Sequence, residues 1–163
     1  MSNNSESLKN LQTALAMELT AAHQYLLHAH TMEDWGLDRL AAKMREEFEE
    51  EIGHADTFMR RIVFLKGSPE MTPAKTPVQA SSLEKLFETD LEDEKEAIEF
   101  YTRAAQAAGA AGDIGTRKIF EDIVLDEEGH MAWLELQLDL LRRIGEPTYV
   151  ATHMTPGGEG QAS

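Results

Sequence analysis

The 163-residue sequence contains no cysteine. A protein without thiols forms no disulfide, holds no zinc ribbon or iron–sulfur cluster, and uses no cysteine nucleophile. Any metal ion that it binds must therefore be held by histidine, aspartate and glutamate side chains. The lack of cysteine is in keeping with a reducing compartment, and we expect the protein in the cytoplasm.

Basic residues are also scarce, at 15 against 30 acidic residues, which gives a net charge of −15. A chain of this charge repels nucleic-acid phosphates and anionic membrane surfaces, and no basic patch offsets the repulsion. No apolar run reaches the roughly 18 residues of a membrane span, and the polar N-terminus has no cationic, apolar signal segment. We expect no nucleic-acid partner and no membrane partner, and cations are the better ligand class.

Proline is rare in most of the chain, with none before Pro69 and none between positions 78 and 146. Proline costs a helix interior about 3 kcal/mol, so its absence leaves room for long helices. Ser81 and Glu84 form a capping box, S-x-x-E, that is expected to open the third of these helices. Apolar residues three and four positions apart predict helices over about 5–35, 38–66, 81–108 and 114–144.

The connections between these helices predict the architecture. Residues 67–81 hold three prolines and predict a long extended crossover, and a short fifth helix is expected around residues 147–153. Two helical hairpins joined by one long crossover are typical of an all-α, ferritin-like four-helix bundle, here with a short C-terminal helix. We expect one ferritin-like domain over residues 1–154 and a disordered tail over residues 155–163.

Two stretches of the sequence read E-x-G-H, from Glu51 to His54 and from Glu127 to His130. Glutamate and histidine three positions apart share one helix face, so each pair can present a carboxylate and an imidazole to one metal ion. A single pair of this kind is a weak signal, because most such pairs are surface polar residues. Two pairs with the same glycine before the histidine are hard to obtain by chance.

The motif belongs to an internal repeat. Glu18 and Glu94 lie 76 positions apart, as do the two motifs, and each lies 33 positions before the first glutamate of its motif. Tyr25 and Tyr101 keep the same offset of 76 positions. Folded as a bundle, a duplicated hairpin of this kind would bring four carboxylates and two imidazoles to one point.

Four carboxylates at an apolar centre need compensation, because burial and mutual repulsion each cost on the order of several kcal/mol. Two divalent cations supply it, and oxygen and imidazole ligands with open positions suit iron, manganese or zinc. The arrangement is the known ligand pattern of ferritin-like di-iron and di-manganese proteins. The predicted metal ligands are Glu18, Glu51, His54, Glu94, Glu127 and His130.

Four stretches carry a resemblance to a known family: M-E-L-T-A-A-H-Q-Y-L-L-H-A, D-W-G-L, H-A-D with R-R-I-V-F-L-K-G, and D-E-E-G-H-M-A-W-L-E. Through them the sequence resembles the bacterioferritins from about residue 7 to residue 150. The resemblance implies two iron ions per subunit and a homo-oligomeric shell of 24 subunits. It implies a ferroxidase that oxidises Fe(II) with oxygen or hydrogen peroxide and stores the ferric mineral.

The resemblance also implies roles for individual residues. Glu51 and Glu127 would bridge the two irons, and the other four ligands would complete the two iron shells in glutamate–histidine pairs. Tyr25 and Trp133 would lie near the centre as electron donors, which places Tyr25 with the six ligands among the catalytic residues.

One position departs from the family. Bacterioferritins bind a haem between two subunits through a methionine directly after the bridging glutamate, and Ile52 stands at this position without a donor atom. Met59 lies about 10 Å further along the helix. We expect no haem in the usual bis-methionine site. The alternatives are haem held by another residue, or a mixed shell whose sister subunit supplies the methionine.

Three other functions compete with iron storage. The main alternative is a rubrerythrin-like di-metal peroxidase or oxidase without storage, which the absence of a cysteine-rich rubredoxin segment disfavours. A DNA-protecting mini-ferritin would place its site between subunits, whereas both motifs here lie in one chain. A non-catalytic shell subunit is disfavoured because the ligand set is complete.

Four glutamates, in two pairs separated by Phe48, precede the first motif. They form either a solvated acidic face or a cavity surface that attracts iron through Glu46 and Glu50. Gly53 and Gly129 each cost a helix interior about 0.5–1 kcal/mol. A helix or ligand passing close to the backbone would explain them, and so would an ordinary packing contact.

Overall fold

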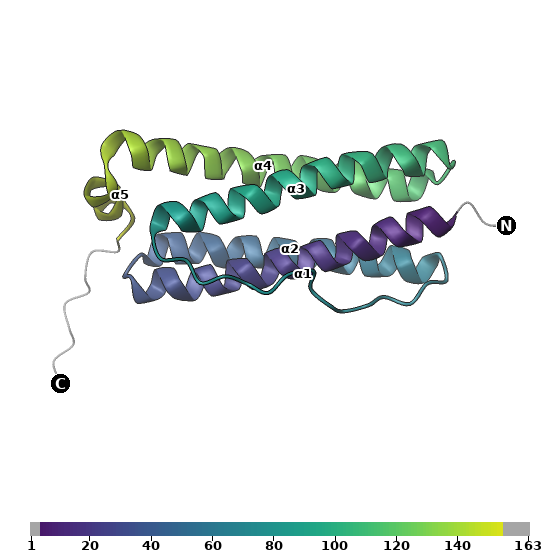
Figure 1. Ribbon diagram of the computed structural model, residues 1–163, viewed down its shortest axis with the longest axis horizontal. Coiled ribbons are helices and arrows are strands. Elements are labelled where there is room, and N and C mark those ends of the chain that lie inside the picture. The colour runs from purple at the N-terminus through teal and green to yellow at the C-terminus, as the bar shows by residue number, and fades with distance from the viewer. Residues whose placement is uncertain (1–3, 155–163) are drawn as a thin grey trace.

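The computed structural model describes residues 4–154, which form five α-helices and no strand (Figure 1). The helices are α1 (Asn4–Asp34), α2 (Asp38–Phe64), α3 (Leu83–Ala110), α4 (Ile114–Ile144) and α5 (Glu146–His153). The first four lie side by side, and α5 packs at one end of the bundle (Figure 1). The expected all-α bundle with one long crossover is confirmed, whereas the expected tail over 155–163 lies outside the described residues. Within the described range, no helix is long and apolar enough to cross a membrane.

The start of α3 differs from the prediction by one residue. The N-cap is Ser82, whose side chain accepts a hydrogen bond from the backbone N–H of Lys85 at 3.2 Å. The expected capping box of Ser81 and Glu84 is therefore wrong. An N-cap hydroxyl accepts a hydrogen bond from the backbone N–H three residues later. For Ser82 this residue is Lys85, which has no carboxylate to complete a capping box.

The buried apolar side chains form two clusters, one on each side of a polar centre. One cluster, toward α5, contains Met32, Phe87 and Leu134, and the other, toward the opposite end, contains Leu15 and Phe58. On each long helix the predicted ligands lie between the residues of the two clusters. The centre of the bundle is thus closed at both ends by apolar packing, which removes water and raises the cost of any uncompensated charge there.

The crossover between α2 and α3 is fastened to α1 by side-chain to backbone hydrogen bonds. The hydroxyl of Thr20 accepts from the backbone N–H groups of Ala74 (2.8 Å) and Lys75 (3.2 Å). The side-chain amide of Gln24 both donates to the carbonyl of Val78 (3.0 Å) and accepts from its N–H (2.9 Å). The extended segment is therefore held along α1, in front of the bundle centre (Figure 1).

Candidate metal centre

All six predicted ligands meet at the centre of the bundle. Each of the four long helices contributes, and every one of these residues is at most 8% exposed. Two groups of four can each offer one ligand atom such that all the atoms lie within 4.8 Å of one another. The groups are Glu18, Glu51, His54 and Glu127, and Glu51, Glu94, Glu127 and His130. Since Glu51 and Glu127 belong to both groups, the geometry favours two neighbouring cation positions that share these carboxylates.

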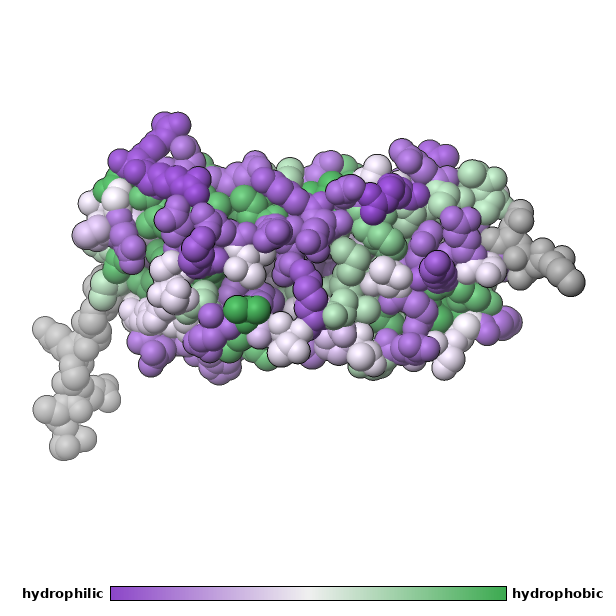
Figure 2. Space-filling view, in the orientation of Figure 1, coloured by the Kyte–Doolittle hydropathy of each residue, from purple (hydrophilic) through white to green (hydrophobic). Residues whose placement is uncertain are grey.

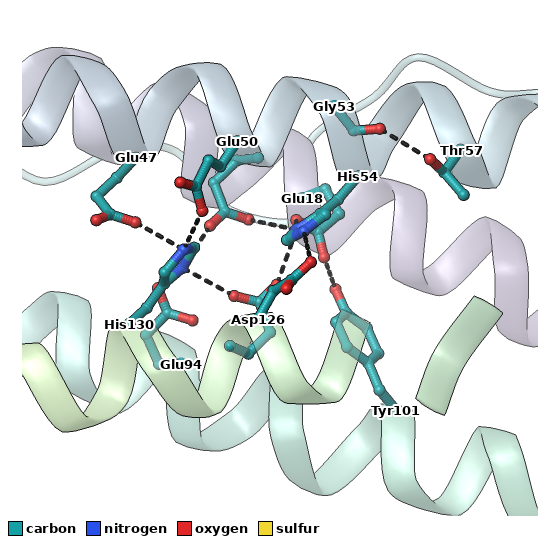
Figure 3. A network of polar contacts seen from close by, with 12 residues as sticks. Glu18, Glu47, Glu50, Gly53, His54, Thr57, Glu94, Tyr101, Asp126 and His130 are labelled. Atoms are coloured by element: carbon teal, nitrogen blue, oxygen red, sulfur yellow. Dashed lines mark hydrogen bonds and ion pairs between the residues drawn. The ribbon is translucent and has the colours of Figure 1, made fainter. Parts of the chain in front are cut away.

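The two histidines face the shared carboxylates with the same ring nitrogen. Nδ1 of His54 lies 3.1 Å from a carboxylate oxygen of Glu127, and Nδ1 of His130 lies 3.0 Å from Glu127 and from Glu51. The rings lie 6.3 Å apart, with 26° between their planes. The two halves thus face the shared carboxylates with approximate symmetry, and Figure 3 shows this network of polar contacts from close by.

Two carboxylates hold the outer nitrogens of these histidines (Figure 3). The sequence analysis did not include Asp126, and it considered Glu50 for the cavity surface and not for a contact with a histidine. Nε2 of His54 lies 3.1 Å from Asp126, and Nε2 of His130 lies 2.7 Å from Glu50. A carboxylate on the outer nitrogen fixes the orientation of a metal-binding imidazole and increases its basicity. Glu50 and Asp126 are themselves 76 positions apart, so the repeat offset would have found them.

Each half of the molecule also holds a carboxylate of the other half through a buried phenol. The hydroxyl of Tyr25 donates a hydrogen bond to Glu94, and that of Tyr101 donates to Glu18. Burial, reinforced by these neighbouring carboxylates, raises the pKa of both phenols well above the ordinary value. The prediction included Tyr25 alone, although Tyr101 has the same place in the repeat.

The approximate symmetry is broken at Glu47. Its carboxylate is 2% exposed, lies 2.7 Å from Nε2 of His130, and forms an ion pair with Lys43. The equivalent position in the second half is Ile123, which is apolar. The group of four glutamates before the first motif is therefore not a uniform solvated face. Glu46 and Glu50 are exposed as expected, whereas Glu47 turns inward.

Protons compensate the buried charge in the absence of cations. Burial, followed by repulsion from Glu51, raises the pKa of Glu18 to about 8, and burial is the main cause of a strongly raised pKa at Glu94. Burial lowers the pKa of His54 and His130. Close ion-pair contacts with Glu127 and other buried carboxylates outweigh this and raise both pKa values above the ordinary range. Cation binding must therefore displace protons from this centre.

Several ligand atoms are buried without a hydrogen-bond partner in the described part of the chain. Protein interiors satisfy about nine in ten buried polar groups, so a cluster of such atoms at one point is unusual. Oxygen and imidazole donors of this kind suit iron, manganese or zinc. The atoms are Oε2 of Glu18, Oε1 of Glu51, both carboxylate oxygens of Glu127, and Nδ1 of His54 and His130. The residues present therefore fit a pair of divalent cations.

The two helical glycines have no close neighbour. Of the described residues, no heavy atom outside their own helices would lie within 4 Å of a Cβ built at Gly53 or Gly129, and both face solvent. Within the described chain, neither a neighbouring helix nor an ordinary packing contact explains these glycines, and the structure gives no physical reason for a glycine at either position.

A four-helix bundle with one long crossover and this central donor set defines the ferritin-like class of di-metal protein. The Ferritin-like domain family matches residues 8–144. Bacterioferritin from Brucella melitensis is 37% identical over 94% of this chain and 96% of its own length. The protein from Rhodobacter capsulatus is 37% identical over 96% and 97%, and the bacterial ferritin of Pseudomonas aeruginosa is 36% identical over 94% and 100%.

A solved structure of the Rhodobacter capsulatus bacterioferritin superposes on the whole chain with a TM-score of 0.92 and 36% identity, and covers 100% of both chains. That protein is described with a metal-free dinuclear site and a haem iron in a crystallographic special position. The chain belongs to the bacterioferritin family, as its sequence resemblance implied.

The residues at the expected haem position do not fit axial ligation. Ile52 has no donor atom and its side chain is 39% exposed on α2. Met59 is part-buried and packs against the apolar cluster that contains Phe58, so its thioether serves the core.

Proposed function

We propose that the protein is an iron-storing ferroxidase whose oxidation centre is formed by the six buried ligands. Membership of the bacterioferritin family supports iron storage. The observation that carries the oxidation step is the convergence of four carboxylates and two imidazoles, with unsatisfied oxygens and nitrogens, on two overlapping four-residue groups.

The chemistry at this centre is a two-electron transfer from a pair of Fe(II) substrate ions. With hydrogen peroxide, two Fe(II), one peroxide and two protons give two Fe(III) and two waters. With dioxygen, two Fe(II) and two protons give two Fe(III) and one hydrogen peroxide. Glu51 and Glu127, which belong to both groups of candidate ligands, would hold the two ions close together, so that both electrons could reach one oxidant.

The protein's own residues orient the ligand carboxylates and balance the charge of the incoming cations. Tyr25 and Tyr101 hold the carboxylates of Glu94 and Glu18 by hydrogen bonds, so that these groups need little reorganisation when a cation binds. The histidines give up protons as iron binds, and Asp126 holds the outer nitrogen of His54.

The storage role implies a shell, and we propose 24 subunits of this chain, with a sister subunit as the alternative. We further propose that this chain contributes no methionine ligand to haem. Size-exclusion chromatography with light scattering is expected to give a particle of about 24 chains, and a stable dimer would remove the storage claim and favour the rubrerythrin-like alternative. A haem-supplemented preparation is expected to lack a bis-thioether Soret spectrum.

Stopped-flow absorbance after addition of two Fe(II) per chain tests the oxidation centre. Fast oxidation is expected in the unchanged protein and is expected to be abolished in Glu51→Ala and His130→Ala. Glu49→Ala, which removes an exposed carboxylate of the same helix, is the matched control and should oxidise iron normally. Unchanged rates in the two ligand variants would place the centre elsewhere.

A further inference from the structure

A cavity of about 40 Å³ lies between α1, α3 and the crossover and reaches the metal centre. It is large enough for about three water molecules. Its inner wall includes the candidate ligands Glu18 and Glu94. Its outer wall includes Lys75 of the crossover together with Asp93 and Glu96 of α3.

Exposure rises steadily from the inner wall of this cavity to the outer one. The side chains of Glu18 and Glu94 are 1% and 4% exposed, whereas those of Asp93, Lys75 and Glu96 are 20%, 54% and 55% exposed. The cavity therefore has its mouth on the face formed by α1, α3 and the crossover, which Figure 2 shows to be mostly hydrophilic. The mouth is defined here by Lys75, Asp93 and Glu96.

A single positively charged side chain stands among the acidic groups at the mouth. Among the described residues that line the cavity, Lys75 is the one with positive charge, and Asp90, Asp93 and Glu96 add negative charge to the glutamates of the centre. The Lys75 ammonium lies 2.8 Å from Asp93 and 3.4 Å from Glu96. It forms ion pairs with the two outermost carboxylates, which an approaching cation would meet first.

The backbone of the mouth is held while the lysine side chain is free to move. Thr20 fixes the N–H groups of Ala74 and Lys75, so the crossover stays in place when the ion pair opens. A half-exposed lysine–carboxylate pair is a weak contact, and its rotamers exchange in nanoseconds. A divalent cation, with twice the charge, can therefore displace the ammonium without movement of the main chain.

We propose that Lys75 is an exchangeable cationic latch over the mouth and sets how readily Fe(II) passes from solvent to the centre. The latch rests on the proposed function, since it acts on the passage of iron to the same ligands. It slows capture of cations at low concentration, because Fe(II) must compete with the ammonium for Asp93 and Glu96. It does not touch the reacting ions, so it is a residue that controls access and not a catalytic residue.

Anaerobic stopped-flow absorbance with Co(II), which binds without being oxidised, tests the latch on the full protein. Lys75→Met removes the charge and keeps the apolar stem, and is expected to speed Co(II) capture about twofold to fivefold at low ionic strength. The difference should shrink in high salt, because exposed charges are screened. Lys75→Arg, which keeps the charge, should not capture Co(II) faster than the unchanged protein.

Lys85→Met is the matched control, because Lys85 also forms an exposed ion pair on α3, with Glu88 at 2.7 Å, and does not line the cavity. Equal capture rates in Lys75→Met and Lys85→Met, with two Co(II) bound per chain in both, would overturn the latch and leave the proposed function intact. Absence of Co(II) binding in the unchanged protein would overturn the proposed function and the latch with it.

Discussion

Tyr101 on α3 donates a hydrogen bond to Glu18 on α1, and so joins the two halves of the molecule at the centre. The bond is the counterpart of the one from Tyr25 on α1 to Glu94 on α3. The candidate ligands Glu18 on α1 and Glu94 on α3 are thus each oriented by a tyrosine of the opposite half. The duplication placed functional groups in pairs, and the pairs allow matched tests.

Tyr101→Phe is expected to lower the free energy of unfolding by about 1–2 kcal/mol, because a buried carboxyl group loses its donor. It should also slow Fe(II) oxidation about tenfold, as loss of a ligand-orienting hydrogen bond does in metal sites. Tyr25→Phe should behave alike. Chemical denaturation and stopped-flow oxidation measure the two effects.

Tyr149→Phe is the control for this prediction. Tyr149 is also fully buried and donates to Gln137 at 2.7 Å, away from the ligands. Its loss should cost similar stability and leave the oxidation rate unchanged. A Tyr101→Phe rate equal to that of Tyr149→Phe would show that the phenol serves packing alone.

Glu47 should affect one cation position more than the other, because it contacts His130 and its counterpart is Ile123. In an anaerobic Co(II) titration, Glu47→Ile is expected to weaken one of two binding phases about tenfold. Asp126→Asn, which acts on His54, should weaken the other phase. If either variant weakened both binding phases equally, this would contradict the view that Glu47 acts through His130 alone and Asp126 through His54 alone.

The metal-free protein should lose stability as pH rises. The pKa of Glu18 is about 8 in the folded chain against an ordinary value of 4.5. The folded state thus keeps a proton that the unfolded state loses, and the stabilisation present below about pH 4.5 disappears as pH rises toward 8. The raised pKa values of His54 and His130 act in the same direction.

Mn(II) should relieve this loss, because cations take the place of the protons. The increase in melting temperature on addition of Mn(II) is therefore expected to be larger near pH 8 than near pH 5. Glu18→Gln mimics the protonated carboxyl group, and should make the metal-free protein less sensitive to pH while weakening Mn(II) binding. A Mn(II) effect that is largest at low pH would contradict the assignment of buried protons to this centre.

At the end of the bundle opposite α5, a substitution can change stability without changing iron oxidation. Asp113 caps α4 by accepting from the N–H of Thr116 at 3.2 Å, and it forms an ion pair with Arg61. Asp113→Ala is expected to cost about 1–3 kcal/mol of unfolding free energy. Iron oxidation below the melting temperature should stay normal, and a large loss of activity would mean that this end of the bundle communicates with the centre.

The fold and the inner ligands could be predicted because their signals are periodic. Proline-free stretches set the helix lengths, and the repeat of 76 positions paired the ligands before any contact was known. The contacts of Asp126 and Glu50 with the histidines were not predicted, because the two residues differ in side-chain length and so break the identity of the repeat. Only the helix packing shows that both reach a histidine.

Glu47 and Lys75 could not be assigned from the sequence for a different reason. Glu47 stands among glutamates of similar appearance, and its inward position depends on the contact with His130 on α4. Lys75 lies in an extended segment without periodicity, and its backbone N–H donates a hydrogen bond to Thr20 that holds this segment along α1. Contacts between distant segments, and not local pattern, place both residues.

The most direct measurement is anomalous X-ray scattering from crystals soaked in Fe(II) without oxygen. We expect two iron peaks per chain between the four helices, with Glu51 and Glu127 contacting both and the Glu18–His54 and Glu94–His130 pairs contacting one each. Anomalous maps without iron among these side chains, at Fe(II) concentrations that support oxidation, would contradict the proposed centre.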